Sequence, residues 1–288
     1  MRRLKASFIY DLKKGFLEGL TTAVRQDIDL DLQIRDNYLN IYYKGNSLLK
    51  LDEVDRHRYR VTVHPKFSGG MDFPELVDDV SVGFFVSRIP YIKENILHYG
   101  KSSLEIEYEQ MIIRANNYEP RNNSEYFIVD RQYVAGKIGR FDLTGVYWPR
   151  ANRHKGQLVS PCLMEVKFAL NRDIQYVHEQ LERYYNAIRE DSAAIAEEIE
   201  IIFKQKLELG LFNQPTNRLN AMRTLRFSPD IEQFRFILIM VDYNPFSQLL
   251  HLDKLSQLSF AAQIRVFYSG FAIWDVGMKS VNETTDND

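Results

Sequence analysis

The chain has very little cysteine and no long apolar run. Cys162 is the single thiol among 288 residues, which excludes a disulfide framework within the chain and a zinc site built from several cysteines. The longest uninterrupted aliphatic or aromatic stretch, residues 236–241, is far too short to cross a bilayer. The basic N-terminal stretch lacks the apolar segment that a signal peptide needs. These absences predict a cytoplasmic protein in a reducing compartment, with no membrane partner.

An excess of charge of one sign is missing as well, since the formal net charge is −2. Proteins that bind nucleic acid through a broad electrostatic field are usually basic, so contact with a phosphate backbone would have to use local patches. Residues 218–226 contain three arginines and no acid. The loop after residue 148 has four basic side chains and no acid, namely Arg150, Arg153, His154 and Lys155. The alternative is that these charged segments are merely solvated.

A nucleotide-binding glycine loop is also absent from the sequence, so any ATP-driven step would need another subunit. What the chain does have is the composition of a globular protein, with 45% hydrophobic and 26% charged residues. Its length suggests one large domain or two modest ones. We expect an N-terminal region at residues 1–95, a second domain at residues 96–280 and a disordered polar tail at residues 281–288.

The N-terminal region is predicted to be a helix followed by an antiparallel β-meander. Apolar residues four apart predict a helix over residues 8–24. After it the period changes to two, as in Leu30, Leu32 and Ile34, and turn residues separate the apolar runs. The expected strands are residues 30–35, 38–43, 48–51 and 59–63. A loose boundary is expected between residues 70 and 99.

The second domain is predicted to alternate helices and strands. Helices are expected at residues 102–115, 171–189 and 192–209, with Asn171 as the N-cap of the second. Strands are expected at residues 126–134, 137–148, 159–169, 234–243 and 264–274. This order of a helix, three strands, a helix and a strand predicts an α/β fold with a mixed sheet flanked by helices.

Charged side chains interrupt two of the apolar strands. Glu165 and Lys167 share one face of the strand at residues 159–169, and Asp142 lies in the preceding strand. Burial of unpaired charge is costly, and two converging acids repel each other unless a cation lies between them. Carboxylate oxygens suit Mg²⁺ or Mn²⁺. The alternative is a salt bridge, buried or at an edge. Cys162 alternates onto the opposite, apolar face, so we expect an inert core residue.

Asp142 followed by Glu165-Val166-Lys167 resembles the D…(D/E)-x-K signature of the PD-(D/E)XK nuclease superfamily. Phe141 stands where the name-giving motif has proline. Gln180 and Tyr184, four residues apart on the next predicted helix, resemble the Q-x-x-x-Y element of the RecB-like branch. The resemblance spans roughly residues 102–243 and does not extend to the N-terminal meander.

The resemblance implies a restriction-endonuclease-like core and Mg²⁺- or Mn²⁺-dependent hydrolysis of DNA phosphodiester bonds. Asp142, Glu165 and the backbone carbonyl of Val166 would be metal ligands. Lys167 would orient the attacking water, Gln180 would hydrogen-bond a phosphate or that water, and Tyr184 would brace the helix or touch the nucleic acid. The family often adds an acid from the first core helix; Glu109 is favoured here, then Glu105. Phosphate contacts would fall to Arg150, Arg153 and Lys155.

The resemblance further implies a setting in DNA defence or repair. Two other hypotheses stay open: a catalytically silent nuclease-fold module that binds nucleic acid or a protein partner, and a plain interaction module that docks through the meander. RNA as substrate, strandedness, endo- or exonuclease action, and assembly as a homo-oligomer or with a partner subunit also stay open.

Overall fold

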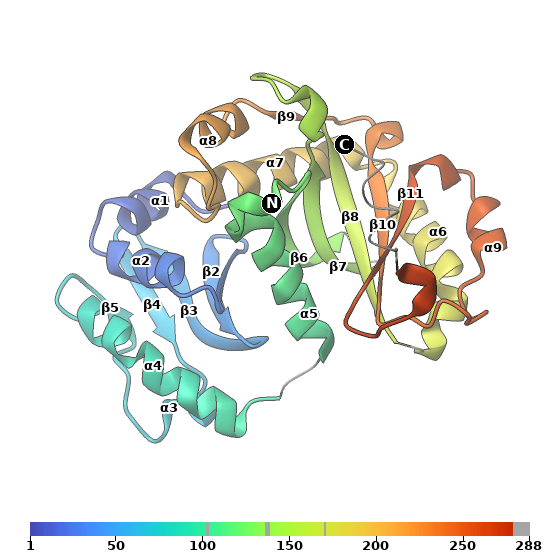
Figure 1. The fold of residues 1–288 in the computed structure, drawn as a ribbon. Helices are drawn as coiled ribbons and strands as arrows, with labels where there is room; N and C mark the ends of the chain where they lie inside the picture. Colours follow the sequence, from blue (N-terminus) through green and yellow to red (C-terminus); the bar gives the residue numbers. More distant parts are fainter. Residues whose placement is uncertain (102–103, 136–138, 170, 279–288) are drawn as a thin grey trace.

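The computed structural model describes residues 1–101, 104–135, 139–169 and 171–278. Within them the chain forms two sheets that lie side by side, with an antiparallel sheet at the N-terminal side and a mixed sheet next to it (Figure 1). The predicted α/β class with an N-terminal meander is confirmed at this level. The predicted disordered tail at residues 281–288 lies outside the described residues. In the described part of the chain, no helix combines the length and apolar character needed to cross a membrane.

The N-terminal sheet contains β1 (Leu30–Ile34), β2 (Tyr38–Tyr43), β3 (Asn46–Asp55), β4 (Arg58–Thr62) and β5 (Leu76–Val77). They pair antiparallel in chain order, which confirms the predicted meander. The single helix predicted over residues 8–24 is wrong. Two helices form instead, α1 (Ala6–Lys13) and α2 (Glu18–Gln26). The N–H groups of Lys14 and Gly15 both bond the carbonyl of Tyr10, and this turn ends α1.

A helix that the sequence did not predict covers this sheet. After the short α3 (Pro65–Ser68), α4 (Val82–Tyr99) runs for 18 residues and buries Phe85, Ile89 and Ile92. Pro90 lies inside it, and a proline in the middle of a segment normally signals a break, because the ring removes an amide donor. The predicted domain division at residues 95 and 96 falls inside this helix.

The mixed sheet has the strand order β11-β10-β8-β7-β6. Its strands are β6 (Tyr126–Ala135), β7 (Gly139–Tyr147), β8 (Leu158–Phe168), β10 (Arg235–Val241) and β11 (Ile264–Ser269), and the short β9 (Arg226–Phe227) pairs with β8. Neighbours among β6, β7 and β8 pair antiparallel, whereas β10 is parallel to both β8 and β11. The predicted mixed sheet is therefore confirmed; the predicted first residue of β7, Lys137, lies outside the described residues.

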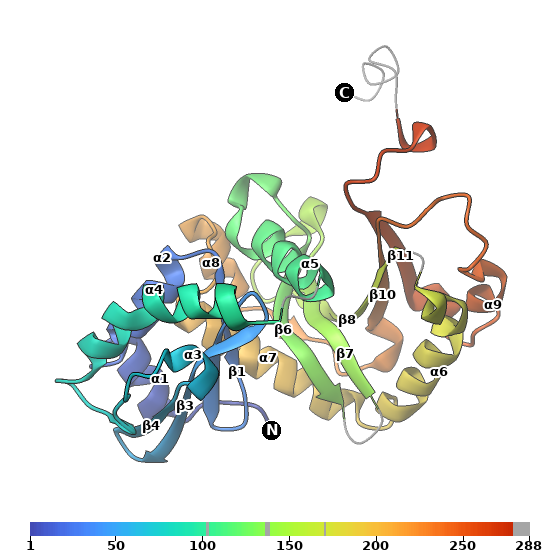
Figure 2. The ribbon, with the colours of Figure 1, turned by 90° about the horizontal axis from the view of Figure 1, so that it is seen from below.

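Helices lie on both faces of the mixed sheet (Figure 2). One face carries α6 (Val177–Ile188) and α7 (Ser192–Glu208), and the opposite face is crossed by α5 (Leu104–Ile113). The predicted helix at 171–189 begins as a 3₁₀ turn at Arg172–Tyr176, where Asn171 Oδ1 accepts from the N–H of Asp173 as expected of an N-cap. The shorter α8 (Thr216–Met222) and α9 (Leu252–Ser256) complete the α-helices of the described residues.

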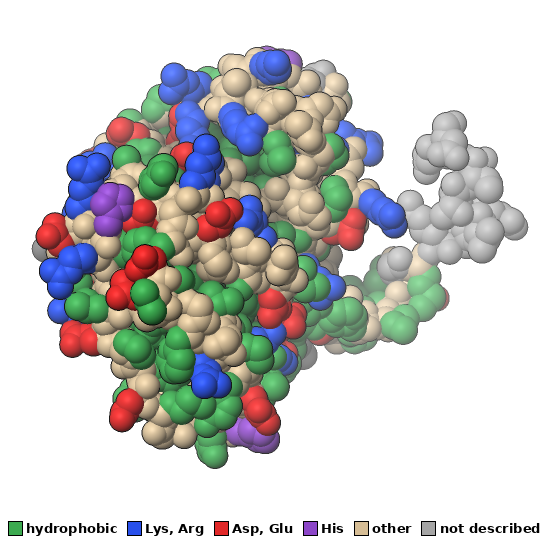
Figure 3. Space-filling view, turned by 90° about the vertical axis from the view of Figure 1, so that its left-hand side faces the viewer, with side chains coloured by type: hydrophobic (Ala, Val, Ile, Leu, Met, Phe, Trp, Pro, Cys, Tyr) green, Lys and Arg blue, Asp and Glu red, His purple; other side chains and the backbone are tan. Residues whose placement is uncertain are grey.

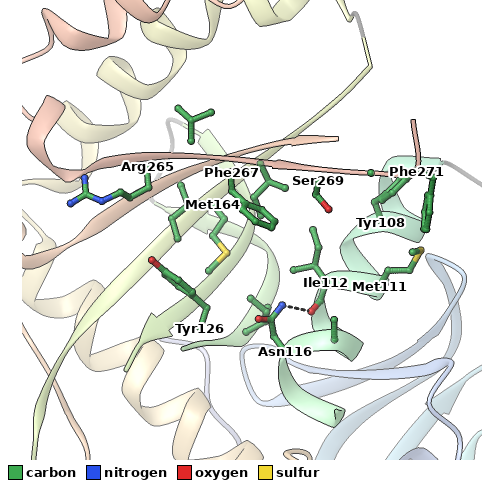
Figure 4. A pocket seen from close by; sticks show the side chains of 16 residues that line it. Tyr108, Met111, Ile112, Asn116, Tyr126, Met164, Arg265, Phe267, Ser269 and Phe271 are labelled. Carbon is green, nitrogen blue, oxygen red and sulfur yellow. Dashed lines mark hydrogen bonds between the residues drawn. The ribbon is translucent and has the colours of Figure 1, made fainter. Parts of the chain in front are cut away.

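Two hydrophobic clusters divide along the same faces. The larger contains buried side chains from both the N-terminal region and the mixed sheet, so one continuous core joins them. The smaller lies under α5 and includes Cys162, Met164 and Val166, which confirms the predicted apolar face of β8. Because α5 covers only part of this face, an apolar cavity of about 530 Å³ remains between α5 and β11, with Tyr108 and Phe271 at one end and Arg265 at the other (Figure 4).

Candidate metal centre

The candidate site lies where β7 loses its regular alternation. Phe141 packs on Tyr184 of α6, with ring centroids 4.6 Å apart, whereas Leu143 belongs to the cluster under α5. Residues two apart share a face in a regular strand. Phe141 and Leu143 therefore point to opposite faces of the sheet, and the strand changes face at Asp142 between them.

The neighbouring strand changes face at the matching position. Arg131 pairs with Leu143 and contacts α5, whereas Tyr133 pairs with Phe141 and donates a hydrogen bond to Glu198 of α7. Gln132 lies between them with φ 54°, in the left-handed region that a residue with a Cβ rarely adopts. This conformation allows the side chains of both Arg131 and Gln132 to reach the same helix.

Asp142 also lies where β7 separates from β8. The pairing of the two strands ends at Leu143 and Met164. Beyond that point the N–H of Val166 donates to Asp142 Oδ2 at 2.8 Å. In a strand the N–H and C=O of one residue point to the same side. The carbonyl of Val166 is therefore directed toward the side on which Asp142 lies.

Two acids of α5 complete a group of three carboxylates. Glu105 and Glu109 are four residues apart and so share a helix face. Together with Asp142 they offer oxygens that all lie within 4.8 Å of one another. Glu109 is fully buried and Asp142 is 5% exposed, whereas Glu105 reaches in from the surface. Both acids that the sequence offered for the first core helix thus lie at the site.

Glu165 lies beside this group and is held by two neighbours, one from β8 and one from α6. It is 4% exposed, and its Oε1 accepts from Lys167 Nζ at 2.7 Å and from Gln180 Nε2 at 2.6 Å. The same Gln180 amide also donates to the hydroxyl of Tyr184 at 2.9 Å. The structure thus brings together the acid, the lysine and the Q-x-x-x-Y residues. Among the described residues, Glu165 Oε2 has no hydrogen-bond partner.

The buried carboxylates are poorly compensated as anions. Burial, followed by the charge of Glu165, raises the pKa of Asp142 to about 8. Burial raises the pKa of Glu109 to about 7, although Arg131 opposes the shift. Burial also raises the pKa of Glu165, against the effect of Lys167. A bound cation would relieve this excess of negative charge.

Lys167 stays charged in this setting. Burial lowers its pKa, but the neighbouring carboxylates, with Glu165 first, outweigh burial and leave the pKa raised. On the α6 side, Lys167 and Gln180 line a depression of about 340 Å³ together with Asp173, Tyr176, Glu179 and Arg183. The lysine is therefore reachable from solvent, whereas Asp142 and Glu109 lie deeper.

The basic loop lies at the other end of the β7–β8 hairpin. It connects the end of β7 to the start of β8, whereas Asp142 is near the start of β7. The six residues from Asp142 to Trp148 span about 20 Å in a strand. Arg153 stacks on Trp148 and donates to Asn123 at 2.8 Å, whereas Arg150 and Lys155 are exposed.

The arginine-rich segment at residues 218–226 lies beside the basic loop. Arg218 also donates to Asn123, at 2.7 Å, so the two basic segments lie together at this far end. On the face that the N-terminal region presents, Lys and Arg side chains are instead mixed with Asp and Glu (Figure 3), in keeping with the near-zero net charge.

Sequence reasoning missed the residues that support Glu109. Gln132 Nε2 donates to Glu109 Oε1 at 2.7 Å, and Arg131 Nε lies 3.6 Å from Glu109 Oε2. The signal that identified Asp142 and Glu165, a charge inside an apolar strand, is also present at Asp130-Arg131 in YFIVDRQYV.

No protein-family profile, curated protein or solved structure matches the chain.

Proposed function

We propose that this chain is a metal-dependent nuclease that hydrolyses DNA phosphodiester bonds on a restriction-endonuclease-like core of the RecB-like type. The observation that carries the proposal is the convergence of Asp142, Glu165 and Lys167 with two α5 acids at the point where β7 separates from β8. The order of α5, β6–β8, α6 and β10 supports the core assignment. A setting in DNA defence or repair follows only from this analogy of fold.

The carboxylates fit a divalent cation. Hard oxygen ligands suit Mg²⁺ or Mn²⁺, and buried acids with raised pKa values favour a cation between them. Glu165 Oε2 and Glu109 Oε2 are buried and, in the described chain, accept no hydrogen bond. Asp142, Glu109 and Glu105 would hold the ion, with Glu165 and the carbonyl of Val166 beside them. When bound, such an ion lowers the pKa of a water molecule and offsets charge on the phosphate.

The other residues of the site would orient the attacking water, neutralise the phosphate and hold the neighbouring side chains in place. The Lys167 ammonium, charged and reachable from solvent, is placed to bind a non-bridging phosphate oxygen and to orient the attacking water. Gln180 fixes the carboxylate of Glu165, and Tyr184 fixes Gln180 from the following helical turn. These contacts set the rotamers of the acid and the lysine before substrate arrives, which is how a site gains preorganisation.

A catalytically silent module that binds nucleic acid or a protein is the second candidate. It is favoured by the tight Lys167–Glu165 contact, which engages the lysine with a neighbouring acid, and by the position of Glu165 outside the group of three. The two candidates differ in turnover and not in affinity, so a cleavage assay separates them.

The test is incubation of the purified full chain with linear duplex, circular and single-stranded DNA, and with RNA, in Mg²⁺ or Mn²⁺. Controls are EDTA and Lys167→Ala. Metal-dependent cleavage that the variant loses is the expected result, and the circular substrate then separates endo- from exonuclease action. Binding without cleavage of any substrate would contradict the proposal and support the silent module.

A further inference from the structure

Strand β1 of the N-terminal sheet presents a row of buried polar side chains to β6 of the mixed sheet. Asp31, Gln33 and Arg35 alternate along β1 and are all buried. Arg35 donates to Asp130 Oδ1 at 2.6 Å and to the carbonyl of Arg131 at 3.2 Å. Burial of so many charged groups at one seam costs free energy unless each has a partner of fixed geometry. The seam is therefore a specific contact between the two sheets.

One chain of contacts in this seam leads to the candidate metal centre. Arg131 is 3% exposed, and its guanidinium lies between two carboxylates. Nη1 is 3.5 Å from Asp31 Oδ2 on one side, and Nε is 3.6 Å from Glu109 Oε2 on the other. The guanidinium also lies over the ring of Tyr42 in β2, 5.0 Å from its centroid. The N-terminal sheet thus contacts Arg131 through two strands.

The far end of the chain of contacts is anchored on α7. Gln33 donates to Asp31 Oδ1 at 2.5 Å, and Lys206 donates to Gln33 Oε1 at 2.9 Å. Lys206 is buried, so its ammonium has lost its water as well. Asp31 therefore has one oxygen held from α7 and the other directed at Arg131. Its position does not depend on the metal centre, which allows it to serve as a fixed support.

From these contacts we infer that Arg131 is a positioning residue, through which the N-terminal sheet holds Glu109 in place to ligate a divalent cation. Gln132 holds one oxygen of Glu109 by a hydrogen bond from β6, and the Arg131 guanidinium attracts the other oxygen across 3.6 Å. Asp31 in turn orients Arg131 from β1. Substitution of a residue that orients a metal ligand through such contacts typically lowers metal affinity by about 10- to 100-fold. The inference rests on the proposed metal centre, and it assigns a role to the N-terminal region, which the nuclease resemblance does not reach.

The test compares Mn²⁺ binding, by calorimetry on the full chain, between wild type and Asp31→Asn. Asn keeps the size of the side chain but removes the charge that faces Arg131. The matched control is Asp27→Asn, which also removes an acid of the N-terminal region. Asp27 pairs with Lys93 at 2.6 Å and takes no part in the contacts that lead to Glu109. We expect Asp31→Asn to weaken Mn²⁺ binding on the order of tenfold, and Asp27→Asn to leave it unchanged.

Two further measurements separate positioning from general loss of structure. In a Glu109→Gln background, Asp31→Asn should cause no further loss of Mn²⁺ affinity, because the group it acts through is already gone. At saturating Mn²⁺ the Asp31→Asn variant should regain the wild-type cleavage rate. Arg131→Lys keeps the buried charge but cannot span both carboxylates, and it serves if Asp31→Asn does not fold.

The outcomes distinguish this inference from the function it rests on. If Asp31→Asn or Arg131→Lys binds Mn²⁺ with wild-type affinity, the inference alone is overturned. Equal losses of Mn²⁺ affinity in Asp31→Asn and Asp27→Asn would overturn it as well. Wild type that binds no Mn²⁺ would overturn the proposed metal centre and the inference with it.

Discussion

The carboxylate of Asp142 takes the place of a strand partner for Val166: its Oδ2 accepts the Val166 N–H at 2.8 Å beyond the last paired residues of β7 and β8. Asp142 therefore has a structural role besides its place in the group of carboxylates with Glu105 and Glu109. A substitution that keeps an acceptor oxygen separates these two roles.

Asp142→Asn should preserve the fold and remove the activity. The amide oxygen can still accept from Val166, and replacement of a buried carboxyl with a raised pKa should leave the free energy of unfolding equal or higher. Metal-dependent cleavage should fall on the order of 10²-fold or more, because a ligand is lost. Thermal unfolding and initial cleavage rates check both parts. Wild-type rates in a folded variant would remove Asp142 from the site.

Lys167→Met should slow cleavage without lowering the affinity for the metal. Loss of the ammonium removes the group that orients water and neutralises phosphate, a change of about 10²–10⁴-fold in rate. The Mn²⁺ affinity should hold or rise, since Glu165 loses its 2.7 Å cationic neighbour. Calorimetry and single-turnover rates give the two readouts, with Lys254→Met on the exposed surface of α9 as control. A fall in affinity with an unchanged rate at saturating Mn²⁺ would assign the lysine a structural role instead.

The pKa of Asp142 makes the stability of the metal-free protein depend on pH. This pKa is about 8 in the folded chain against 3.8 as the ordinary value. Between these values the unfolded chain has released a proton that the folded chain still holds, so the free energy of unfolding falls as pH rises from about 4 to about 8. The slope approaches at most about 1.4 kcal/mol per pH unit for one such group.

Urea unfolding in EDTA at several pH values measures this slope. Asp142→Asn should flatten it, and the difference between the two proteins excludes the contributions of histidines. Excess Mg²⁺ should also flatten it in wild type, because the cation replaces the proton. Identical slopes for the variant and the wild type in EDTA would contradict the raised pKa of Asp142.

Gly139→Ala should disturb the site through Tyr184. A Cβ at Gly139 would lie 2.0 Å from Tyr184 Cε1, and that ring is packed against Phe141 and cannot easily move away. We expect a loss of about 1–3 kcal/mol in stability and a slower reaction, since Tyr184 holds Gln180. Gly83→Ala in α4, where a Cβ meets nothing within 4 Å, is the control and should leave the rate unchanged and the stability equal or slightly higher. Equal behaviour of the two variants would contradict this account.

The sequence predicted the strands and their faces where apolar and polar residues alternate regularly. Alternation of apolar and polar residues in the sequence identified the meander and the faces of β8, and so placed Glu165 and Lys167 together. Alternation fails at Gln132 and Asp142, where both strands change face, and a positive φ at a glutamine leaves no compositional signal. The charged pair Asp130-Arg131 is visible in the sequence, but the direction in which Arg131 points was hidden for that reason. The helix α4 was missed because Pro90 signals a break that tertiary packing overrides.

A chain that starts at residue 100 should fail to fold. The larger hydrophobic cluster would lose every side chain that the N-terminal region contributes. Arg131 and Asp130 would lose Asp31 and Arg35 while remaining in an apolar setting. Circular dichroism and proteolysis of the fragment beside the full chain check this. A fragment with a cooperative unfolding transition would show that the mixed sheet stands alone.

The seam of buried charges between β1 and β6 also limits how such a protein can evolve. An apolar seam tolerates many partners of similar shape, whereas Arg35 with Asp130 and Arg131 with Asp31 each require the matching side chain at a fixed position. The N-terminal sheet is thus poorly suited to exchange between proteins as an independent module. Changes on either side of the seam would have to arise in pairs, so Asp31 and Arg131 should co-vary wherever this arrangement recurs.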